Sequence, residues 1–283
     1  MARAVFGASA VFLVVVLLSV YVFVGIGSLN IFKHVSPWHF LLVDQWTPYA
    51  STNPDFGAAG IILGSLAVVG MAILIATPFS LGAALFLEET NKQLGERVLR
   101  PVLEVFVGIP SVVYGWLGLT ALVPVIRGIS HEGSGQSLLA ATLVLSIMIV
   151  PTVTTLSADA IRNVPTALAE ASYALGATRW QTIWRTILPA ARAGITTGIV
   201  LGIARALGEA LAVAMVIGNI PGLPTHLFGP AATMTTVISA DLASRALNPV
   251  LNDALYTLGM LLLLLSLALI LIIRYLSRGF QAK

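Results

Sequence analysis

Long apolar runs separated by short polar stretches set the pattern of this chain. A helix needs about 20 apolar residues to cross the hydrocarbon core of a bilayer, which is about 30 Å thick. Runs of this length predict six transmembrane helices, at residues 5–29, 56–87, 101–126, 137–160, 188–219 and 254–273. A signal-peptide core has only roughly 7–15 residues, so we expect the first run to remain as a span.

Helix-breaking residues interrupt the third and fourth predicted spans. Pro110 lies inside the third, where its missing N–H leaves a backbone carbonyl without its helical partner, and Pro151 predicts a kink in the fourth. Broken helices are tolerated within membranes where they line cavities. The hydroxyls of Ser111 and Tyr114 follow the first break, so they are candidates to line a pathway; hydrogen bonds between helices are the alternative use.

The composition supports a membrane protein and excludes several other classes. Hydrophobic residues make up 58% of the chain and charged residues 10%, whereas soluble domains are about 25% charged. The absence of cysteine excludes disulfides, thiolate metal sites and cysteine nucleophiles. The four histidines lack metal-site spacing and no GxxxxGK[ST] phosphate loop occurs, so we expect neither a metal nor nucleotide hydrolysis in this chain.

The basic residues give an orientation signal. Six spans place both termini on one side, which collects Arg3, Lys92, Arg97, Arg100, Arg162, Arg179, Arg185, Arg192, Arg274, Arg278 and Lys283. The other side has Lys33, Arg127 and Arg245. The positive-inside rule therefore predicts cytoplasmic termini. The net charge of +3 needs no nucleic-acid partner once these residues are placed beside a lipid bilayer.

The fifth predicted span, Leu188 to Asn219, carries two charges deep inside. Counted from Pro189, Arg205 lies roughly 24 Å along the helix, within the hydrocarbon core. A charge there costs roughly 3 kcal/mol and normally faces a bundle interior or a pathway. Glu209 follows at i, i+4, so we expect the two side chains to meet. A self-neutralising structural pair and a polar pathway both remain possible.

Small residues precede this pair on the same helix. Gly194, Gly198 and Gly202 recur every four residues, and Ala206 continues the row. Such a ridge lets another helix approach closely. We expect a tight helix interface here.

The segment between the fourth and fifth spans, at 162–189, is too apolar for a linker and too charged for a span. Pro165 can begin a first helix, and Gly176 suits its left-handed cap. Thr178 can cap a second helix. There Trp180, Ile183, Trp184 and Ile187 fall at i, i+3, i+4 and i+7, one apolar face. This face either lies on the inner leaflet or docks into a groove of a cytoplasmic partner.

This segment resembles the EAA loop of bacterial ABC-importer permeases. The matching positions are Glu170, Ala171, Ser172, Gly176, Leu188 and Pro189. Ser172 replaces the usual Ala and Thr186 a usual Ile, and neither change removes the turn or the apolar face. The resemblance implies that Glu170, Ala171, Gly176, Trp180, Ile183 and Trp184 belong to helices that seat in ATPase subunits.

Three further stretches resemble phosphate-specific importer permeases of the PstC type. They are IPSVVYG at 109–115, ALGATRW at 174–180 and RALGEALAVAMVIGN at 205–219. Ala210 departs from the Thr that commonly follows the RALGE run. The resemblance implies an all-α, polytopic membrane protein with six transmembrane helices and the MetI-like architecture of type I ABC importers. It divides the chain into an N-terminal helix and extracytoplasmic loop (1–55) and a permease core (56–283).

The resemblance also implies a passive transport subunit of the cell membrane rather than an enzyme. Its expected partners are a PstA-type permease, a dimer of the PstB-type ATPase that binds ATP and Mg, and an extracytoplasmic phosphate-binding protein. A guanidinium offers paired donors that match phosphate oxygens, so Arg205 is our candidate for substrate contact. Glu209 could hold Arg205 in the empty pathway or accept the proton of hydrogen phosphate. Sulfate and molybdate remain alternative substrates.

Two other classes of function are compatible with six spans. A secondary anion transporter or channel needs no ATPase, and a docking surface with two Trp and two Ile argues against it. A membrane enzyme needs a nucleophile, base and acid, and no such set is apparent at membrane depth in the sequence.

Overall fold

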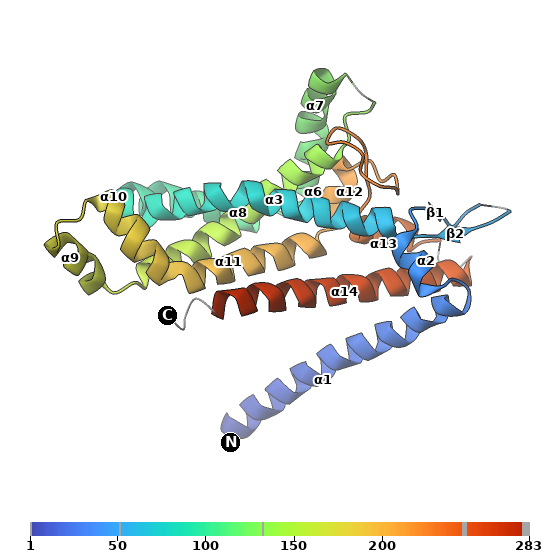
Figure 1. Cartoon of the computed structure of the whole chain (residues 1–283), viewed down its shortest axis with the longest axis horizontal. Helices are drawn as coiled ribbons and strands as arrows, with labels where there is room; N and C mark the ends of the chain where they lie inside the picture. The colour runs from blue at the N-terminus through green and yellow to red at the C-terminus, as the bar shows by residue number, and fades with distance from the viewer. Residues whose placement is uncertain (1, 51, 132, 245–247, 279–283) are drawn as a thin grey trace.

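In this computed structural model, residues 2–50, 52–131, 133–244 and 248–278 are described, and they are helical almost throughout. Among the described residues, six helices are long and apolar enough to cross a membrane, which confirms the predicted number of spans. The start of α1 (Ala2–Leu29) and the end of α14 (Pro249–Arg278) lie toward the same end of the molecule in Figure 1. That placement fits an even number of spans.

The remaining elements follow α1 and precede α14 along the chain. The helices are α2 (Pro37–Leu42), α3 (Ala59–Leu85), α4 (Lys92–Leu94), α5 (Arg100–Gly108), α6 (Ser111–Leu117), α7 (Val123–Ser130), α8 (Leu138–Arg162), α9 (Thr166–Ala174), α10 (Arg179–Thr182), α11 (Leu188–Gly208), α12 (Leu211–Val216) and α13 (Met234–Asp241). Short 3-10 or π-helical segments are η1 (Asn30–Lys33), η2 (Phe86–Thr90), η3 (Gly95–Leu99), η4 (Gly118–Leu122) and η5 (Ile183–Ile187). Two strands, β1 (Trp46–Thr47) and β2 (Asp55–Phe56), pair antiparallel.

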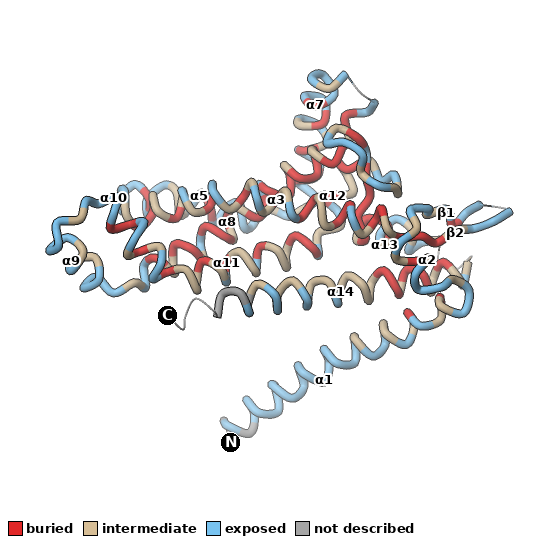
Figure 2. The backbone as a smooth tube through the Cα atoms, viewed as in Figure 1, coloured by how far each residue is buried: buried red, intermediate tan, exposed pale blue. Residues whose placement is uncertain are grey.

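Helix α8 is the central column of the bundle. It packs against α3, α11, α5 and α12, and most of its residues are buried, as the red tube in Figure 2 shows. Polar side chains tie it to α3: Ser146 donates to the Ala72 carbonyl at 3.3 Å, and Ser80 of α3 donates to the Val150 carbonyl at 3.2 Å. Such hydrogen bonds between helices are typical within membranes, where water offers no alternative partner.

Helix α1 packs against the bundle over only part of its length. It meets α14 only toward its own C-terminal end and diverges from it toward the N-terminus (Figure 1). Phe23 and Tyr256 make an edge-to-face contact at 5.7 Å, and Thr257 donates to the Ser28 carbonyl at 3.0 Å. The rest of α1 is exposed and apolar (Figure 2), so lipid or another protein must cover it.

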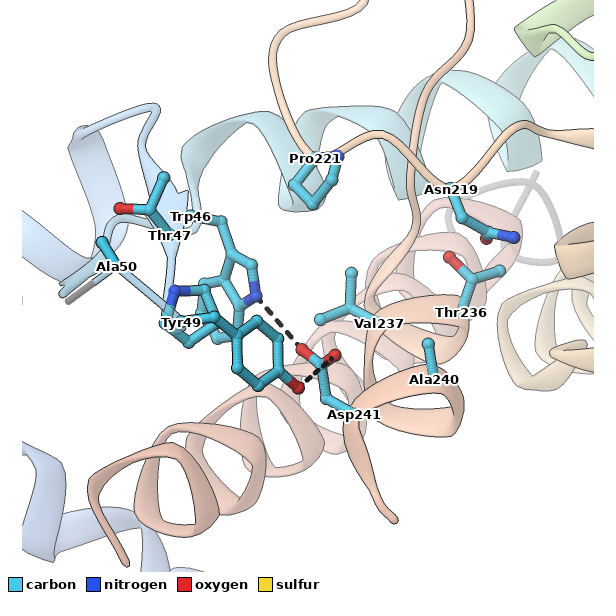
Figure 3. A pocket seen from close by; sticks show the side chains of 11 residues that line it. Trp46, Thr47, Tyr49, Ala50, Asn219, Pro221, Thr236, Val237, Ala240 and Asp241 are labelled. Carbon is cyan, nitrogen blue, oxygen red and sulfur yellow. Dashed lines mark hydrogen bonds between the residues drawn. The ribbon is translucent and has the colours of Figure 1, made fainter. Parts of the chain in front are cut away.

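The expected loop at 30–55 does contain a short helix, α2, whose first turn has Pro37 and is capped by Ser36. It is followed by the β1–β2 hairpin, a small departure from an all-α fold within the described residues. Hairpin and α13 border a cavity of about 490 Å³ (Figure 3). There the Asp241 carboxylate accepts hydrogen bonds from Trp46 Nε1 at 3.3 Å and from the Tyr49 hydroxyl at 3.0 Å.

Candidate functional site

The fifth span is broken near its C-terminal end. Helix α11 ends at Gly208, and Glu209 adopts extended backbone with φ −76° and ψ 120°. Glycine costs about 1 kcal/mol relative to alanine in a helix, so this position favours an end. The Glu209 carboxylate then accepts a hydrogen bond from the Ala212 N–H at 3.2 Å, and this bond satisfies a free donor in the first turn of α12.

Arg205 lies one turn before this break and is half-buried. Its Nη1 donates to Thr152 Oγ1 of α8 at 3.0 Å. No ion pair joins Arg205 to Glu209 within the part of the chain that the structure describes. The prediction that the two pair at i, i+4 on one helix is therefore wrong, because the helix ends between them.

The third span is broken as well, at the predicted proline. Helix α5 ends at Gly108, Ile109 is extended with ψ 126°, and α6 begins at Ser111. A residue before proline is disfavoured in helical backbone, which accounts for the conformation of Ile109. Residues 101–126 are thus a series of helical pieces, as the helix-breaking residues predicted, and α7 projects away from the bundle in Figure 1.

Tyr114 repairs the hydrogen bonding at this break. Its hydroxyl donates to the carbonyl of Phe106 at 2.7 Å. In a continuous helix the N–H of residue 110 would serve that carbonyl, and Pro110 has no N–H. The Tyr114 hydroxyl is therefore used within its own span. Ser111 is half-buried, and its hydroxyl forms no hydrogen bond among the described residues.

The two breaks meet through α6 and α12. A Cβ on Gly115 would lie 2.8 Å from the Ala212 Cα, so the backbones approach as closely as only glycine allows. Tyr114 also lies close enough to Arg205 for an electrostatic interaction. Non-helical backbone at membrane depth occurs only where protein buries it or water lines it. The pairing of both breaks beside Arg205 marks this region as the candidate translocation site.

The segment after α12 packs against the site. Thr235 Oγ1 donates to the Glu209 carbonyl at 2.9 Å, and Thr233 Oγ1 lies 3.0 Å from Thr235 Oγ1. The cavity that Glu209, Thr233 and Thr235 line with Ser65 measures only about 10 Å³. That volume is near the minimum for a single water, so this cavity holds no oxyanion in the conformation described.

The glycine ridge of α11 packs closely against another helix, as predicted, and that helix is α8. A Cβ on Gly194 would meet that of Ala160, one on Gly198 would lie 3.0 Å from the Leu156 Cβ, and one on Gly202 would lie 2.8 Å from Val153 Cγ2. None of these distances leaves room for a larger side chain without displacement. The ridge is therefore a packing surface that holds the fifth span against the fourth.

The loop at 162–189 folds into the two predicted short helices. Gly176 has φ +82°, its N–H donates to the Tyr173 carbonyl at 2.9 Å, and the Ala177 N–H donates to the Ser172 carbonyl at 3.2 Å. These two bonds form the Schellman ending that glycine favours. Thr178 forms a capping box at the start of α10. Glu170 and Ala171 lie on the exposed surface of α9.

The predicted apolar face of the second helix is only partly buried. Ile183 and Ile187 are buried in an apolar cluster at the end of the bundle that carries α9 and α10. Trp180 and Trp184 are instead 65% and 53% exposed, and their rings contact each other at 5.4 Å. The bundle covers only one edge of the face, because the helix runs through the π-helical segment η5 directly into α11. A pair of exposed tryptophans is left pointing away from the protein.

Several residues of these sites were not singled out from sequence. Thr152 partners Arg205, Thr235 anchors the Glu209 backbone, and a buried Glu88 forms ion pairs with Arg162 and Arg100. The position of Thr152, directly after Pro151 in a predicted span, was an available signal for its role. Acidic residues at span ends usually reach water, so the sequence carried no signal that Glu88 is buried.

These features define a polytopic membrane protein with interrupted helices and an exposed loop at 162–189 that presents a surface. Residues 76–282 match the family described as "Binding-protein-dependent transport system inner membrane component". The chain belongs to this family, and it is a permease subunit of an ABC importer and a multi-pass protein of the inner membrane. Members are transport subunits rather than enzymes.

Relatives extend the match over nearly the whole chain. The chain is 46% identical over 277 residues to the "Probable ABC transporter permease protein YqgH" of Bacillus subtilis (strain 168), covering 97% of this chain and 89% of that protein. It is 32% identical over 263 residues to the "Phosphate transport system permease protein PstC" of Mesorhizobium japonicum, covering 86% and 79%. The resemblance to PstC-type permeases is therefore confirmed.

Solved structures show the same fold. An inward-facing structure of the MetNI methionine ABC transporter gives a TM-score of 0.60 at 21% identity, covering 77% of this chain and 93% of that one. A bacterial alginate ABC transporter, in complex with an alginate pentasaccharide-bound periplasmic protein, gives 0.63 at 18% identity, covering 95% and 94%. The expected MetI-like architecture is thus confirmed.

Proposed function

We propose that this chain is a transmembrane subunit of an ATP-driven importer of inorganic phosphate. It forms half of the translocation pathway and couples to separate ATPase subunits. The main support for the proposal is the position of Arg205, whose half-buried guanidinium lies beside two broken spans at membrane depth. The PstC-type relatives support phosphate as the substrate.

The chemistry of Arg205 suits a transient contact with an oxyanion. Guanidinium has five N–H donors in a planar fork. Among the described residues only Nη1 is engaged, by Thr152, so the remaining donors are available to a phosphate that arrives in an open pathway. Thr152 orients the side chain meanwhile, without a carboxylate that would compete with the anion.

Glu209 serves a different purpose from the one expected. Its carboxylate begins α12 through the Ala212 N–H, and its carbonyl is held by Thr235. We infer that Glu209 fixes the geometry of the break and keeps its negative charge off Arg205. Ser111 and Tyr114 flank the pathway from the third span, with Ser111 as the hydroxyl still free to face a substrate.

The exposed loop at 162–189 is the coupling surface of the proposed importer. Trp180 and Trp184 present a large apolar area at the end of the molecule that carries α9 and α10 (Figure 1). We infer that this area seats in a PstB-type ATPase dimer, which binds ATP and Mg, and that Glu170, Ala171 and Gly176 shape the α9 side of the contact. Both termini then lie in the cytoplasm.

The complete assembly needs a second permease, which we infer to be of the PstA type, and an extracytoplasmic phosphate-binding protein. Residues 1–55 form the N-terminal helix and outer loop of this subunit, and residues 56–283 form the permease core. The exposed apolar surface of α1 supports burial against lipid or a partner.

Reconstitution with these partners tests the proposal. Wild-type vesicles are expected to take up phosphate with ATP, and Arg205→Leu is expected to abolish uptake while association with the ATPase survives. The control is Arg97→Leu, which removes one arginine from an exposed position and should leave uptake intact. Uptake by Arg205→Leu at the wild-type rate refutes the role of Arg205. If sulfate or molybdate is taken up at the same rate as phosphate, specificity for phosphate is refuted. Uptake of phosphate without ATP indicates a secondary transporter.

A further inference from the structure

Four charged side chains form a cluster where the second, third and fourth spans reach the end that carries the coupling loop. Glu88, in η2 at the end of α3, is only 6% exposed. Arg162, the last residue of α8, donates to it through Nη2 at 2.6 Å and through Nε at 3.2 Å. Arg100, the first residue of α5, lies 3.8 Å away, and Glu96 of η3 lies 3.6 Å from Arg162.

A buried carboxylate of this kind is costly to leave without its partners. Glu88 receives Arg162 through two nitrogens, the fork geometry that fixes both position and direction. Nε of Arg100 is buried without a hydrogen bond, so Glu88 is the acidic partner that holds Arg100 in this part of the structure. Loss of the Glu88 charge would leave Arg100 without an ion pair among the described residues and Arg162 with only Glu96, at 3.6 Å.

The cluster lies between the coupling loop and the broken third span. Arg162 is followed at once by the loop, and α9 begins at Thr166. The apolar cluster beside it includes Leu87 from the Glu88 segment together with Ile183 and Ile187 from the loop. Arg100 begins α5, which runs without interruption to the break that precedes α6. A displacement of the loop therefore has a contiguous path to the candidate translocation site.

We propose that Glu88 is a positioning residue for energy coupling: its ion pairs with Arg162 and Arg100 make the coupling loop and α5 move together. This inference rests on the proposed function and extends it from the docking surface to the pathway. Glu88 touches neither substrate nor nucleotide. Its role is to transmit a displacement, and the quantity that it controls is the amount of phosphate imported for each ATP hydrolysed.

The test is Glu88→Gln in the reconstituted importer, with Glu89→Gln as control. Glu89 is the next residue and forms no ion pair among the described residues. We expect Glu88→Gln to assemble with the ATPase and to hydrolyse ATP, while phosphate imported per ATP falls at least tenfold. Glu89→Gln should match the wild type. Glu88→Asp, which restores the charge on a shorter arm, should recover part of the ratio.

A second variant covers the case in which Glu88→Gln does not assemble. Arg162→Lys keeps the charge and loses the fork, so it should lower the ratio by a smaller factor. A wild-type ratio in Glu88→Gln, or in Arg162→Lys when Glu88→Gln fails to assemble, overturns the inference. An equal fall in Glu89→Gln also overturns it. Failure of the proposed function itself is distinct, because the wild type would then show no ATP-dependent uptake of phosphate.

Discussion

Replacing Tyr114 with phenylalanine examines how the third span tolerates its break. Tyr114 is 7% exposed, and its hydroxyl donates to the Phe106 carbonyl at 2.7 Å. Phenylalanine fills the same space without the hydroxyl. The carbonyl that Pro110 already deprives of a backbone donor would then have no described partner at membrane depth.

An unsatisfied buried polar group costs about 1–3 kcal/mol. For a protein of 150–250 residues, 1 kcal/mol lowers Tm by about 2–4 °C. We therefore expect Tyr114→Phe to unfold at a temperature lower by about 2–12 °C in detergent or nanodiscs. Thermal unfolding followed by tryptophan fluorescence measures the difference directly.

The decisive measurement adds Pro110→Ala. Alanine restores an N–H that can reach the Phe106 carbonyl, so the Tyr114 hydroxyl becomes redundant. In this background we expect Tyr114→Phe to cost less than in the wild type by more than about 0.5 kcal/mol, the margin within which independent sites add. An equal loss of stability in both backgrounds would refute the explanation that the hydroxyl replaces the missing amide.

Three further predictions concern other parts of the molecule. Trp180→Ala should weaken binding of the ATPase subunits at least tenfold in a pull-down titration while Tm stays unchanged, since its side chain is exposed. Gly198→Leu should separate α11 from α8 and lower the yield of monodisperse protein in size-exclusion chromatography, whereas Gly70→Leu should not, because a Cβ on Gly70 meets no atom within 4 Å. Burial, with a contribution from Asp241, raises the pKa of Tyr49. The contribution of neutral Tyr49 to stability is full below the ordinary tyrosine pKa and is lost as pH rises through the raised pKa. Asp241→Asn should lower the pKa of Tyr49, which an ultraviolet titration measures.

The spans and the loop caps could be predicted because their causes are local. Apolar length determines which segments cross the membrane, and the left-handed conformation of Gly176 follows from the residue type that ends a helix in this way. The break at Pro110 was also visible, since proline removes a donor wherever it occurs in a helix. The ridge of Gly194, Gly198 and Gly202 predicted a close helix contact but did not identify α8 as the partner.

The break at Glu209 could not be predicted in the same way. Alanine and leucine surround Gly208, and both are strong helix formers. The contact that holds the extended backbone comes from Thr235, 26 residues further along the chain. Arg205 likewise finds Thr152 at a sequence separation of 53 residues. Local periodicity therefore favoured an i, i+4 pair that tertiary contacts prevent.

Tertiary contacts also decide which residues of the second loop helix are buried and which are exposed. Periodicity places Trp180 and Ile183 on one face, but the inner end of the bundle covers only part of it. Ile183 enters the apolar cluster formed with Leu87 and Leu103, whereas Trp180 remains outside. A helix face read from sequence does not show how much of it a neighbour will cover.

The close fit of the glycine ridge against α8 determines where this subunit can flex. Sliding α11 along α8 would drive Ala160, Leu156 and Val153 into backbone that has no room for them, so we expect α8 and α11 to move together. Bending is left to the unwound segments at Ile109–Pro110 and Glu209–Ala210. The sequence contains no cysteine, so introduced disulfide pairs can map this division without background: a bond between α8 and α11 should leave turnover intact, and one across either unwound segment should stop it.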